Sequence, residues 1–392
     1  MKHLIIGCGI SGIHIAIQLL DNGTRGQDIL ILEKSGYNCS KLFTIKENAI
    51  RDDGKHEEVI LEMGPSVMHS KQEEILKLIS KLGLLNTIEK VNPKEKAFYV
   101  YPGLPSDEVK KIWKELKKRV FEVEDITLTL KEASKKVLNN KEYNILKTCW
   151  GEWYEMCDCN LQILKKSMEE EGEYLIMKGG FDQIITKGIE YLEKQNVNIN
   201  FECEVTALKE FRVHDNKGNE YVYEKLYICG NYKGIKSIKT DIPLIKEYLL
   251  LGKSKNCLRF YVYFKKKVNI PYKFIFGNFL GKFSIKYSDR LWLIAYPDGE
   301  LATKLNKMNK RKIVNDWIKM INNNFNLDII IKDVGLEYCC YWEDAFSILK
   351  KEGVTKANII HNKLKENNII ITCLPKNKGE SSAWMEGHLY KL

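Results

Sequence analysis

The glycine-rich segment near the start of the chain constrains the fold most. Gly7, Gly9 and Gly12 form a G-x-G-x-x-G pattern between an apolar strand expected over Lys2–Ile6 and a helix expected over Ser11–Asn22. In this pattern the first glycine permits a tight turn, the second lets the backbone approach a pyrophosphate, and the third permits close packing of helix and strand. The helix N-terminus adds N–H groups and the positive end of its dipole. The segment therefore predicts a dinucleotide-binding turn.

A carboxylate follows at the place where such a fold needs one. A second apolar strand, expected over Asp28–Leu32, ends at Glu33. The whole β–α–β unit spans roughly 30 residues, as a dinucleotide-binding unit does. An acid at this position accepts hydrogen bonds from ribose hydroxyls and would repel the 2′-phosphate of NADP. We interpret Glu33 as a ribose ligand rather than a solvated strand-end carboxylate, with FAD and NAD both open at this point.

Further along the chain, Rossmann-like elements alternate with other material. Residues 131–165 read as helix-rich, with Trp150 and Trp153 in a core. Apolar periodicity predicts further elements. The expected helices are Gln72–Leu84, Asp107–Val120, Gln183–Lys194 and Asn306–Asn323, and the expected strands are Val197–Phe201, Val205–Phe211, Tyr221–Tyr223, Lys225–Cys229, Leu258–Lys265, Lys273–Phe279, Leu291–Tyr296 and Asn368–Thr372. The pattern predicts an α/β fold in which a Rossmann-like domain is interleaved with a mixed α+β domain.

Charge and cysteine content exclude several classes of function. The net charge of +10 comes from lysines mixed with acids along the expected helices, which is typical of solvated faces and indicates no nucleic-acid partner. The eleven cysteines are scattered and odd in number, which favours a reducing compartment over a disulfide framework. Neither Cys157 and Cys159 nor the Cys339–Cys340 pair has a partner at zinc-site spacing, so we expect no metal.

The apolar run after Met1-Lys2 superficially imitates a signal peptide. The three glycines of the turn interrupt this run, and a second strand follows where a cleavage site would be expected. No other stretch is long and apolar enough to span a bilayer. We therefore expect a soluble protein of the cytoplasm with no integral membrane segment and leave its oligomeric state open.

The segments that follow Glu33 carry a family resemblance. Glu33-Lys34-Ser35 leads to Lys41-Leu42-Phe43-Thr44 and then to Leu61-Glu62-Met63-Gly64-Pro65-Ser66. This order resembles the flavin-containing amine oxidase superfamily, which includes monoamine and polyamine oxidases, with phytoene desaturases and protoporphyrinogen oxidases as relatives. The resemblance implies FAD as cofactor. Its implied binding residues are Gly7, Gly9, Ile10, Ser11, Gly12, Glu33, Lys34, Lys41, Gly64, Pro65, Ser66, Val205, Trp384 and Met385.

The middle of the chain continues the resemblance. Gly179-Gly180-Phe181-Asp182 before a helix looks like the family's return to the FAD domain, where the backbone at Val205 would meet the adenine. The resemblance implies a discontinuous FAD-binding domain of residues 1–70, 174–235 and 365–392. The remaining stretches, 71–173 and 236–364, would form the substrate-binding domain.

The last part of the chain resembles the family around the flavin ring. Ala383-Trp384-Met385-Glu386-Gly387 is similar to the segment whose helix points at the flavin, so Trp384 would flank the flavin face. Helix-end N–H groups stabilise negative charge that develops on the ring during reduction. On the substrate-domain strand, Arg259 stands where amine oxidases carry a lysine near flavin N5, and Trp342–Phe346 resembles a tryptophan-acid segment. Lys351 stands where covalent flavoproteins have cysteine, which implies non-covalent FAD.

These observations predict an FAD-dependent oxidoreductase. By resemblance, a hydride would pass from a small substrate, an amine in the first instance, to flavin N5, with Arg259 and Trp384 as catalytic residues. The alternative is a catalytically inactive flavin-binding or structural protein, because Cys39-Ser40 and Arg259 depart from the family's pattern and Pro375 replaces its usual acid. An NAD-linked dehydrogenase would explain the glycines and Glu33 but not Met385-Glu386-Gly387.

Overall fold

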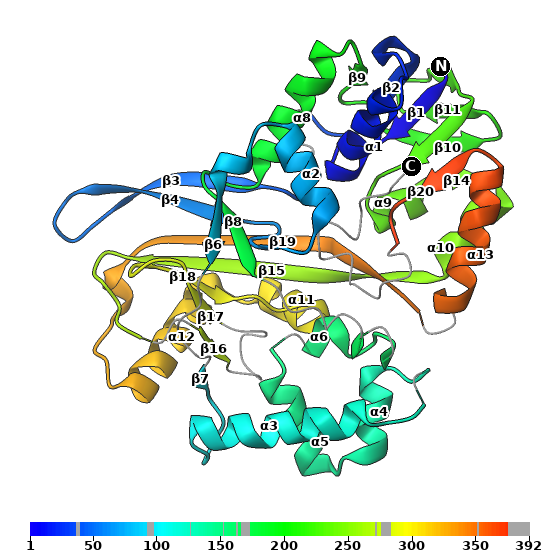
Figure 1. Cartoon of the computed structure of the whole chain (residues 1–392). Helices are drawn as coiled ribbons and strands as arrows, with labels where there is room; N and C mark the ends of the chain where they lie inside the picture. Colours follow the sequence, from blue (N-terminus) through cyan, green and yellow to red (C-terminus); the bar gives the residue numbers. More distant parts are fainter. Residues whose placement is uncertain are drawn as a thin grey trace.

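The N-terminal β–α–β unit forms the centre of a five-stranded parallel sheet in the computed structural model (Figure 1). β1 (His3–Ile6) pairs with β2 (Ile29–Leu32) on one side and β13 (Lys225–Ile228) on the other. β9 (Asn198–Asn200) and β20 (Ile369–Ile371) are the outer strands. The structure describes residues 1–36, 40–91, 98–125, 127–151, 153–161, 164–165, 173–270, 273–275, 284–350 and 353–374.

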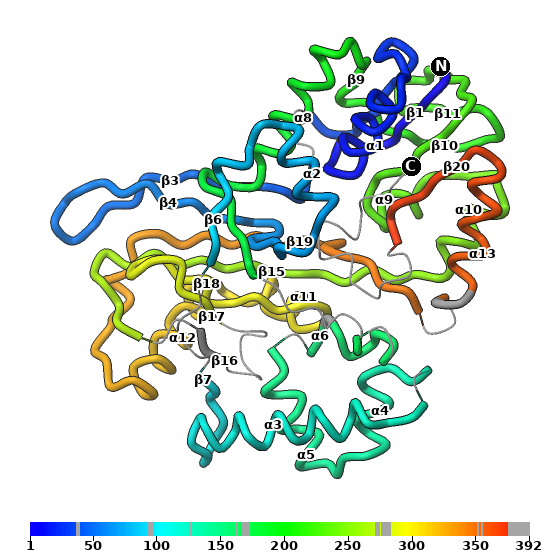
Figure 2. Tube along the Cα trace, viewed as in Figure 1, coloured from blue at the N-terminus to red at the C-terminus, as the bar shows by residue number. Residues whose placement is uncertain are grey.

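Helices cover both faces of this sheet, because its strands are apolar on both faces. Successive residues of a strand point to opposite sides, so Ile5 packs beneath α1 (Ile10–Asp21) and α8 (Asp182–Lys194), whereas Leu4 packs toward the opposite core. That second core contains residues of α10 (Pro243–Leu250), α9 (Tyr232–Ser237) and α13 (Gly353–Glu366). Figure 2 shows how segments from distant parts of the sequence meet here. The predicted Rossmann-like α/β class is confirmed.

Two glycines make the turn between β1 and α1 possible. Gly7 has φ +97°, a left-handed conformation that side chains rarely adopt, and its N–H donates to Leu32 O at 2.8 Å. A Cβ on Gly12 would lie 2.0 Å from the carbonyl oxygen of Gly7. Any side chain at Gly12 would therefore separate the first helical turn from the glycine loop.

Two smaller sheets flank the parallel sheet. One has the order β12-β11-β10-β14 and the other the order β5-β8-β6. The strands of the first are β10 (Val205–Lys209), β11 (Arg212–Asp215), β12 (Glu220–Val222) and β14 (Lys239–Thr240). The strands of the second are β5 (Met68–His69), β6 (Ile88–Val91) and β8 (Tyr174–Met177), with α2 (Glu73–Lys81) nearby. Short 3₁₀ helices lie at Gly26–Asp28, Leu85–Thr87 and Ile331–Asp333.

A second large sheet supplies the other half of the molecule. Its order is β19-β15-β18-β17-β16-β7, and the long antiparallel pair β15 (Gly252–Phe264) and β19 (Val334–Leu349) forms its edge. The shorter strands are β18 (Leu291–Ala295), β17 (Ser284–Lys286), β16 (Lys273–Ile275) and β7 (Phe98–Tyr99). α11 (Gly299–Lys307) and α12 (Lys310–Phe325) pack on one face, where Trp317 Nε1 donates to Ser284 Oγ at 2.9 Å.

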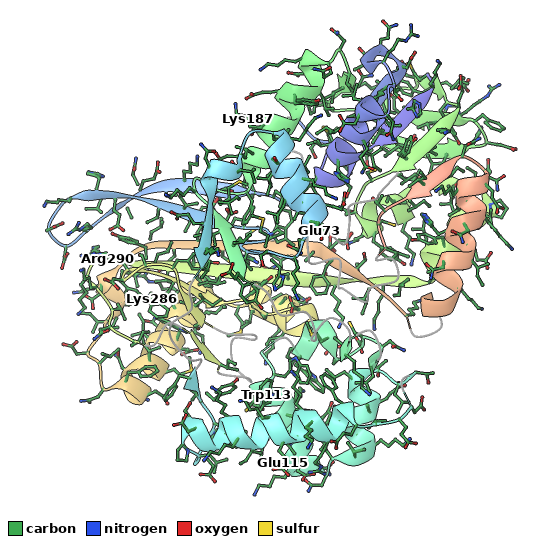
Figure 3. The ribbon with its side chains drawn as sticks, in the orientation of Figure 1. Glu73, Trp113, Glu115, Lys187, Lys286 and Arg290 are labelled. Atoms are coloured by element: carbon green, nitrogen blue, oxygen red, sulfur yellow. The ribbon has the colours of Figure 1, made fainter. Side chains whose placement is uncertain are left out.

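A separate helical group forms its own core beside this sheet. It contains α3 (Ser106–Phe121), α4 (Leu130–Val137), α5 (Asn140–Cys149) and α6 (Trp153–Met156). Capping boxes at Thr129/Glu132 and Asn139/Glu142 fix the starts of α4 and α5. Figure 3 shows Trp113 and Glu115 on α3; Trp113 packs edge-on against the buried Trp150, whereas Glu115 is exposed. Within the described ranges, no helix combines the length and apolar character needed to cross a membrane.

Most predicted elements lie where expected, with one correction and several omissions. The single helix predicted over Asn306–Asn323 is wrong: α11 ends at Lys307, and the Asn309 side chain accepts a hydrogen bond from Lys312 N and so begins α12. The strand predicted over Val205–Phe211 is shorter, because Phe211 adopts φ +58° in the turn to β11. The structure also contains elements that were not predicted, namely β19, α10, α13 and the hairpin of β3 (Thr44–Ile50) and β4 (His56–Glu62).

Glu62, at the end of β4, joins four parts of the chain. Its buried carboxylate accepts hydrogen bonds from Thr44 Oγ1 at 3.0 Å and from Phe181 N, at the start of α8, at 2.8 Å. Its carbonyl oxygen accepts from Arg259 Nη1 at 3.2 Å and from Tyr261 OH at 2.8 Å, both on β15. This residue therefore ties the hairpin to the helix that covers the parallel sheet and to the second large sheet.

Burial raises the pKa of the Glu62 carboxyl to about 7, although the hydrogen bonds from Phe181 and Thr44 and the charge of Arg259 favour its ionised form. The folded state then holds a proton that the unfolded chain, with its ordinary pKa of 4.5, releases. The contribution of Glu62 to the free energy of unfolding is therefore greatest below pH 4.5 and is lost as pH rises to about 7.

A first prediction concerns the third glycine of the turn. Gly12→Ala should lower the free energy of unfolding by about 3 kcal/mol or abolish folding, because its Cβ would collide with rigid backbone. Gly36→Ala, where a Cβ meets nothing within 4 Å, should change it by less than about 0.5 kcal/mol. Urea denaturation of both variants is the measurement, and equal stabilities would contradict the packing role of Gly12.

A second prediction concerns pH. The side chain of Glu62→Gln stays neutral at all pH values. The free energy of unfolding of this variant should therefore not show the decrease between pH 5 and 8 that titration of Glu62 causes in the parent. Relative to the parent, the variant should gain up to about 3 kcal/mol as pH rises to 8. Urea denaturation at the two pH values measures it. Glu58→Gln, at an exposed position of the same strand, is the control and should follow the parent's pH profile. An unchanged profile for Glu62→Gln would refute the titration.

Candidate functional site

A cavity of about 310 Å³ connects the glycine turn with the second large sheet. At one end lie residues that follow β1 and β2, and at the other lie residues of β15 and β19. Of the residues predicted to bind a cofactor, those that line it are Gly7, Gly9, Ile10, Ser11, Glu33, Lys34, Lys41, Gly64, Pro65 and Val205. The predicted catalytic Arg259 lines it too. Gly12 and Ser66 do not, and Trp384, Met385, Cys39, Lys351 and Pro375 lie outside the described residues.

The N-terminus of α1 opens onto this cavity with free backbone donors. Gly9 is the N-cap residue, no side chain of the described residues caps the helix, and its first turn contains no acid. A Cβ on Gly9 would meet only Ser40 Oγ, at 3.9 Å, so the space beside this glycine is open. Unsatisfied N–H groups, the helix dipole and room beside a glycine are the features that hold a phosphate.

Glu33 lies beside this helix start at the end of β2. Its side chain is 6% exposed, and its oxygens accept hydrogen bonds from Cys8 N and Ser35 N, both at 2.7 Å. A carboxylate has about four acceptor sites, so capacity remains for two hydroxyl donors. The hydrogen bond to Cys8 holds this acid against the glycine turn and so sets it next to the phosphate position.

At the end of the cavity that contains the glycine turn and Glu33, the outer wall is formed by the segment that leads into β10. Cys203, Glu204 and Val205 line the cavity, and Glu204 pairs with Lys34 at 2.6 Å. Both charged groups are largely exposed, so this ion pair contributes little to stability. Lys34 and Val205 thus lie at the predicted nucleotide end, on the surface side of Glu33.

Lys41 connects the turn region with the opposite sheet. Its ammonium donates to Ala345 O at 2.8 Å, and Gly64 packs so closely that a Cβ there would lie 1.6 Å from Lys41 O. Burial lowers the pKa of Lys41, and the nearby Asp344 carboxylate opposes that shift. Asp344 itself accepts from Lys233 N at 2.7 Å through one oxygen, while the other has no hydrogen-bond partner among the described residues.

β15 and β19 form the far wall. Arg259 is 3% exposed, and its guanidinium carbon lies 4.1 Å from the centre of the Tyr296 ring. Burial alone would lower the pKa of Arg259, but the surrounding tyrosine hydroxyls hold it well above its usual value. Trp342 Nε1 donates to Met63 O at 2.7 Å, so both strands hold the segment that carries Gly64.

Several lining residues were not predicted. Gly230, Asn231 and Gly234 follow β13, and the Asn231 side chain accepts from Gly234 N at 2.6 Å to begin α9. Their position after a parallel strand was a usable signal, because ligands bind at the carboxyl ends of such strands. Tyr296 gave no comparable signal, since only the folded chain brings its ring beside the Arg259 guanidinium.

The residues at the start of α1 and at the end of β2 suit a dinucleotide. An uncapped helix start can hold a pyrophosphate, and Glu33 can hold a ribose. A redox cofactor bound there would extend toward β15 and β19, because the same cavity contains Arg259 and Trp342. Among the described residues, no cluster of three or more His, Cys, Asp or Glu side chains could hold a metal ion.

Comparisons with known proteins agree with this geometry. A sequence profile described as "Flavin containing amine oxidoreductase" matches residues 10–145. No curated protein sequence matches the chain significantly.

Solved structures show the likeness over almost the whole chain. A putrescine oxidase bound to putrescine has a TM-score of 0.72 at 12% identity, and its A394C mutant 0.72 at 11%. A cyclohexylamine oxidase from Brevibacterium oxydans IH-35A has a TM-score of 0.71 at 14% identity. Each likeness covers 99% of this chain and 96% of the other. The chain thus has the fold of the flavin-containing amine oxidases, and its residues 10–145 match that superfamily in sequence.

Proposed function

We propose that the chain is an FAD-dependent oxidoreductase of the amine oxidase type that acts on a small substrate, an amine in the first instance. The observation that carries this proposal is the single cavity that joins the glycine turn and Glu33 to the wall of β15 and β19. When bound, FAD would accept a hydride at N5 from the substrate carbon. The name of one structural neighbour, putrescine oxidase with putrescine bound, favours an amine as the substrate class.

The chain's own residues have distinct parts in this proposal. The N–H groups at the start of α1 hold the diphosphate, Glu33 holds the ribose, and Lys41 and Gly64 position the segment between the two sheets. The apolar and aromatic residues Trp342, Phe346 and Tyr296 exclude water at the substrate end. FAD would be bound non-covalently, because Lys351 stands where covalent flavoproteins of the superfamily carry cysteine.

The arrangement of elements supports the proposed division of the chain. Residues 1–70, 174–235 and 365–392 would form the FAD-binding domain, because β1, β2, β9, β13 and β20 all come from these stretches. Residues 71–173 and 236–364 would form the substrate-binding domain. Free thiols among the described residues support a reducing, cytoplasmic environment; they include Cys149, Cys157, Cys203, Cys229, Cys339, Cys340 and Cys373.

The third prediction is spectroscopic. The purified protein should show flavin absorption bands, acid precipitation should release the chromophore into the supernatant, and anaerobic addition of a substrate amine should bleach the bands. Visible spectra before and after each step measure this. Bound flavin that no amine bleaches would favour the non-catalytic alternative, and a colourless protein that fails to take up added FAD would refute the proposal.

The fourth prediction separates cofactor binding from folding. Gly9→Ala adds a methyl group to open space in the cavity, so the protein should fold normally but bind FAD at least about tenfold more weakly, because the methyl group occupies the position of the diphosphate. Fluorescence titration of the flavin-free protein with FAD measures the affinity, with thermal unfolding as the check on folding. Gly36→Ala is the matched control and should leave the affinity unchanged.

A further inference from the structure

The two ends of the cavity differ in charge. The acidic residues that line it, Glu33 and Glu204, both lie at the nucleotide end, where Glu33 accepts from Cys8 N and Ser35 N and Glu204 pairs with Lys34. At the end formed by β15 and β19, the charged lining residues are Lys41 and Arg259. Among the described residues, the substrate end is therefore lined by cations without a lining carboxylate.

Lys41 is already engaged at this end. It donates to Ala345 O at 2.8 Å, and the carboxylate of Asp344 lies close enough to influence its pKa. Arg259 is different. Among the described residues, the guanidinium donates to the carbonyl oxygen of Glu62 at 3.2 Å and also interacts with the Tyr261 hydroxyl, so not all of its five N–H donors are used. It forms no ion pair with any described acid.

The groups around Arg259 do not neutralise it. The Tyr296 ring stacks on the guanidinium, and Tyr261 donates its hydroxyl to the same Glu62 carbonyl. The Glu62 carboxyl, which feels the charge of Arg259, accepts its hydrogen bonds from Thr44 and Phe181 rather than from Arg259. A buried guanidinium without a bonded counter-ion is costly, and an anion that enters the cavity would offset that cost.

We propose that the substrate of this site carries a carboxylate, which Arg259 binds through the donors that the protein leaves unused. The proposal rests on the oxidoreductase function above and narrows its substrate class to a small amine that also bears an acidic group. The planar guanidinium can donate two parallel hydrogen bonds to a carboxylate. A lysine ammonium at the same place could not form this paired arrangement. A simple cationic amine would instead meet Lys41 and Arg259, with no lining carboxylate from the described part of the chain to receive it.

The fifth prediction compares three ligands of similar size on the FAD-loaded protein at neutral pH. Benzoate should bind at least about tenfold more tightly than neutral benzyl alcohol, because it adds a charge-assisted pair of hydrogen bonds to the same ring contacts. The difference in affinity between benzoate and cationic benzylamine should be larger than the difference between benzoate and benzyl alcohol, with benzylamine the weaker ligand. Isothermal titration calorimetry gives the three dissociation constants without relying on turnover. Benzylamine that binds as tightly as benzoate would overturn the proposal, and this test needs no variant.

Substitutions at Arg259 test whether this side chain causes the preference for benzoate. Arg259→Met should lower benzoate affinity at least about tenfold and leave benzyl alcohol affinity within about twofold, while Arg259→Lys should retain part of the preference. Arg290→Gln removes a positive charge from another arginine of the same half of the molecule, which does not line the cavity and is labelled in Figure 3. This control should change neither affinity. Unchanged benzoate binding in Arg259→Met would overturn the proposal.

The cofactor offers the competing source of negative charge. If Arg259→Met loses FAD while the wild-type protein shows no preference for benzoate, then the guanidinium serves the cofactor and the proposal fails. If the wild-type protein binds no FAD, the proposed oxidoreductase function fails on its own, and the benzoate preference of the flavin-free protein still decides whether Arg259 is an anion site. The two failures are therefore distinguishable.

Discussion

The hydrogen bonds at Glu62 are the constraint on which the relative placement of the two halves depends. The side chain satisfies an N–H at the start of α8 and a hydroxyl of β3, while the main-chain carbonyl of the same residue accepts from Arg259 and Tyr261. Because these four donors belong to segments far apart in sequence, one buried residue fixes the distance between the parallel sheet's helices and β15. The next residues, Met63 and Gly64, then necessarily lie in the wall of the cavity.

This placement explains why the cavity has two unlike ends. The parallel sheet contributes backbone donors and Glu33, which suit phosphate and sugar groups. The antiparallel pair β15 and β19 contributes long side chains that alternate toward the cavity, among them Arg259 and Trp342. Neither sheet alone encloses the space, and Lys41 spans from one to the other through Ala345. A ligand that reaches both ends would add to the contacts between the halves.

The sequence predicts the parallel sheet well because the information there is local. Gly7, Gly12 and Glu33 act on neighbours within one β–α–β unit, and the strand pattern is nearly all apolar. β19 escaped prediction because one of its faces is half-exposed along most of its length, so no clear alternation of apolar and polar residues remains. The β3–β4 hairpin had a usable signal in Asp53-Gly54, at its turn. The pairing of Arg259 with Tyr296 and the anchoring of Lys41 by Ala345 arise only from tertiary contact.

The order of strands has a consequence for how the protein emerges from the ribosome. β1, β2, β9 and β13 are all present once residue 228 has been synthesised, but β20, which completes the sheet beside β13, is residues 369–371. During the synthesis of the intervening stretch, β13 is an apolar edge strand with unpaired backbone groups, a state that invites association with other chains. β15 and β19 are synthesised in the same interval and can pair before β20 exists. The second large sheet can therefore form while the parallel sheet still lacks its last strand.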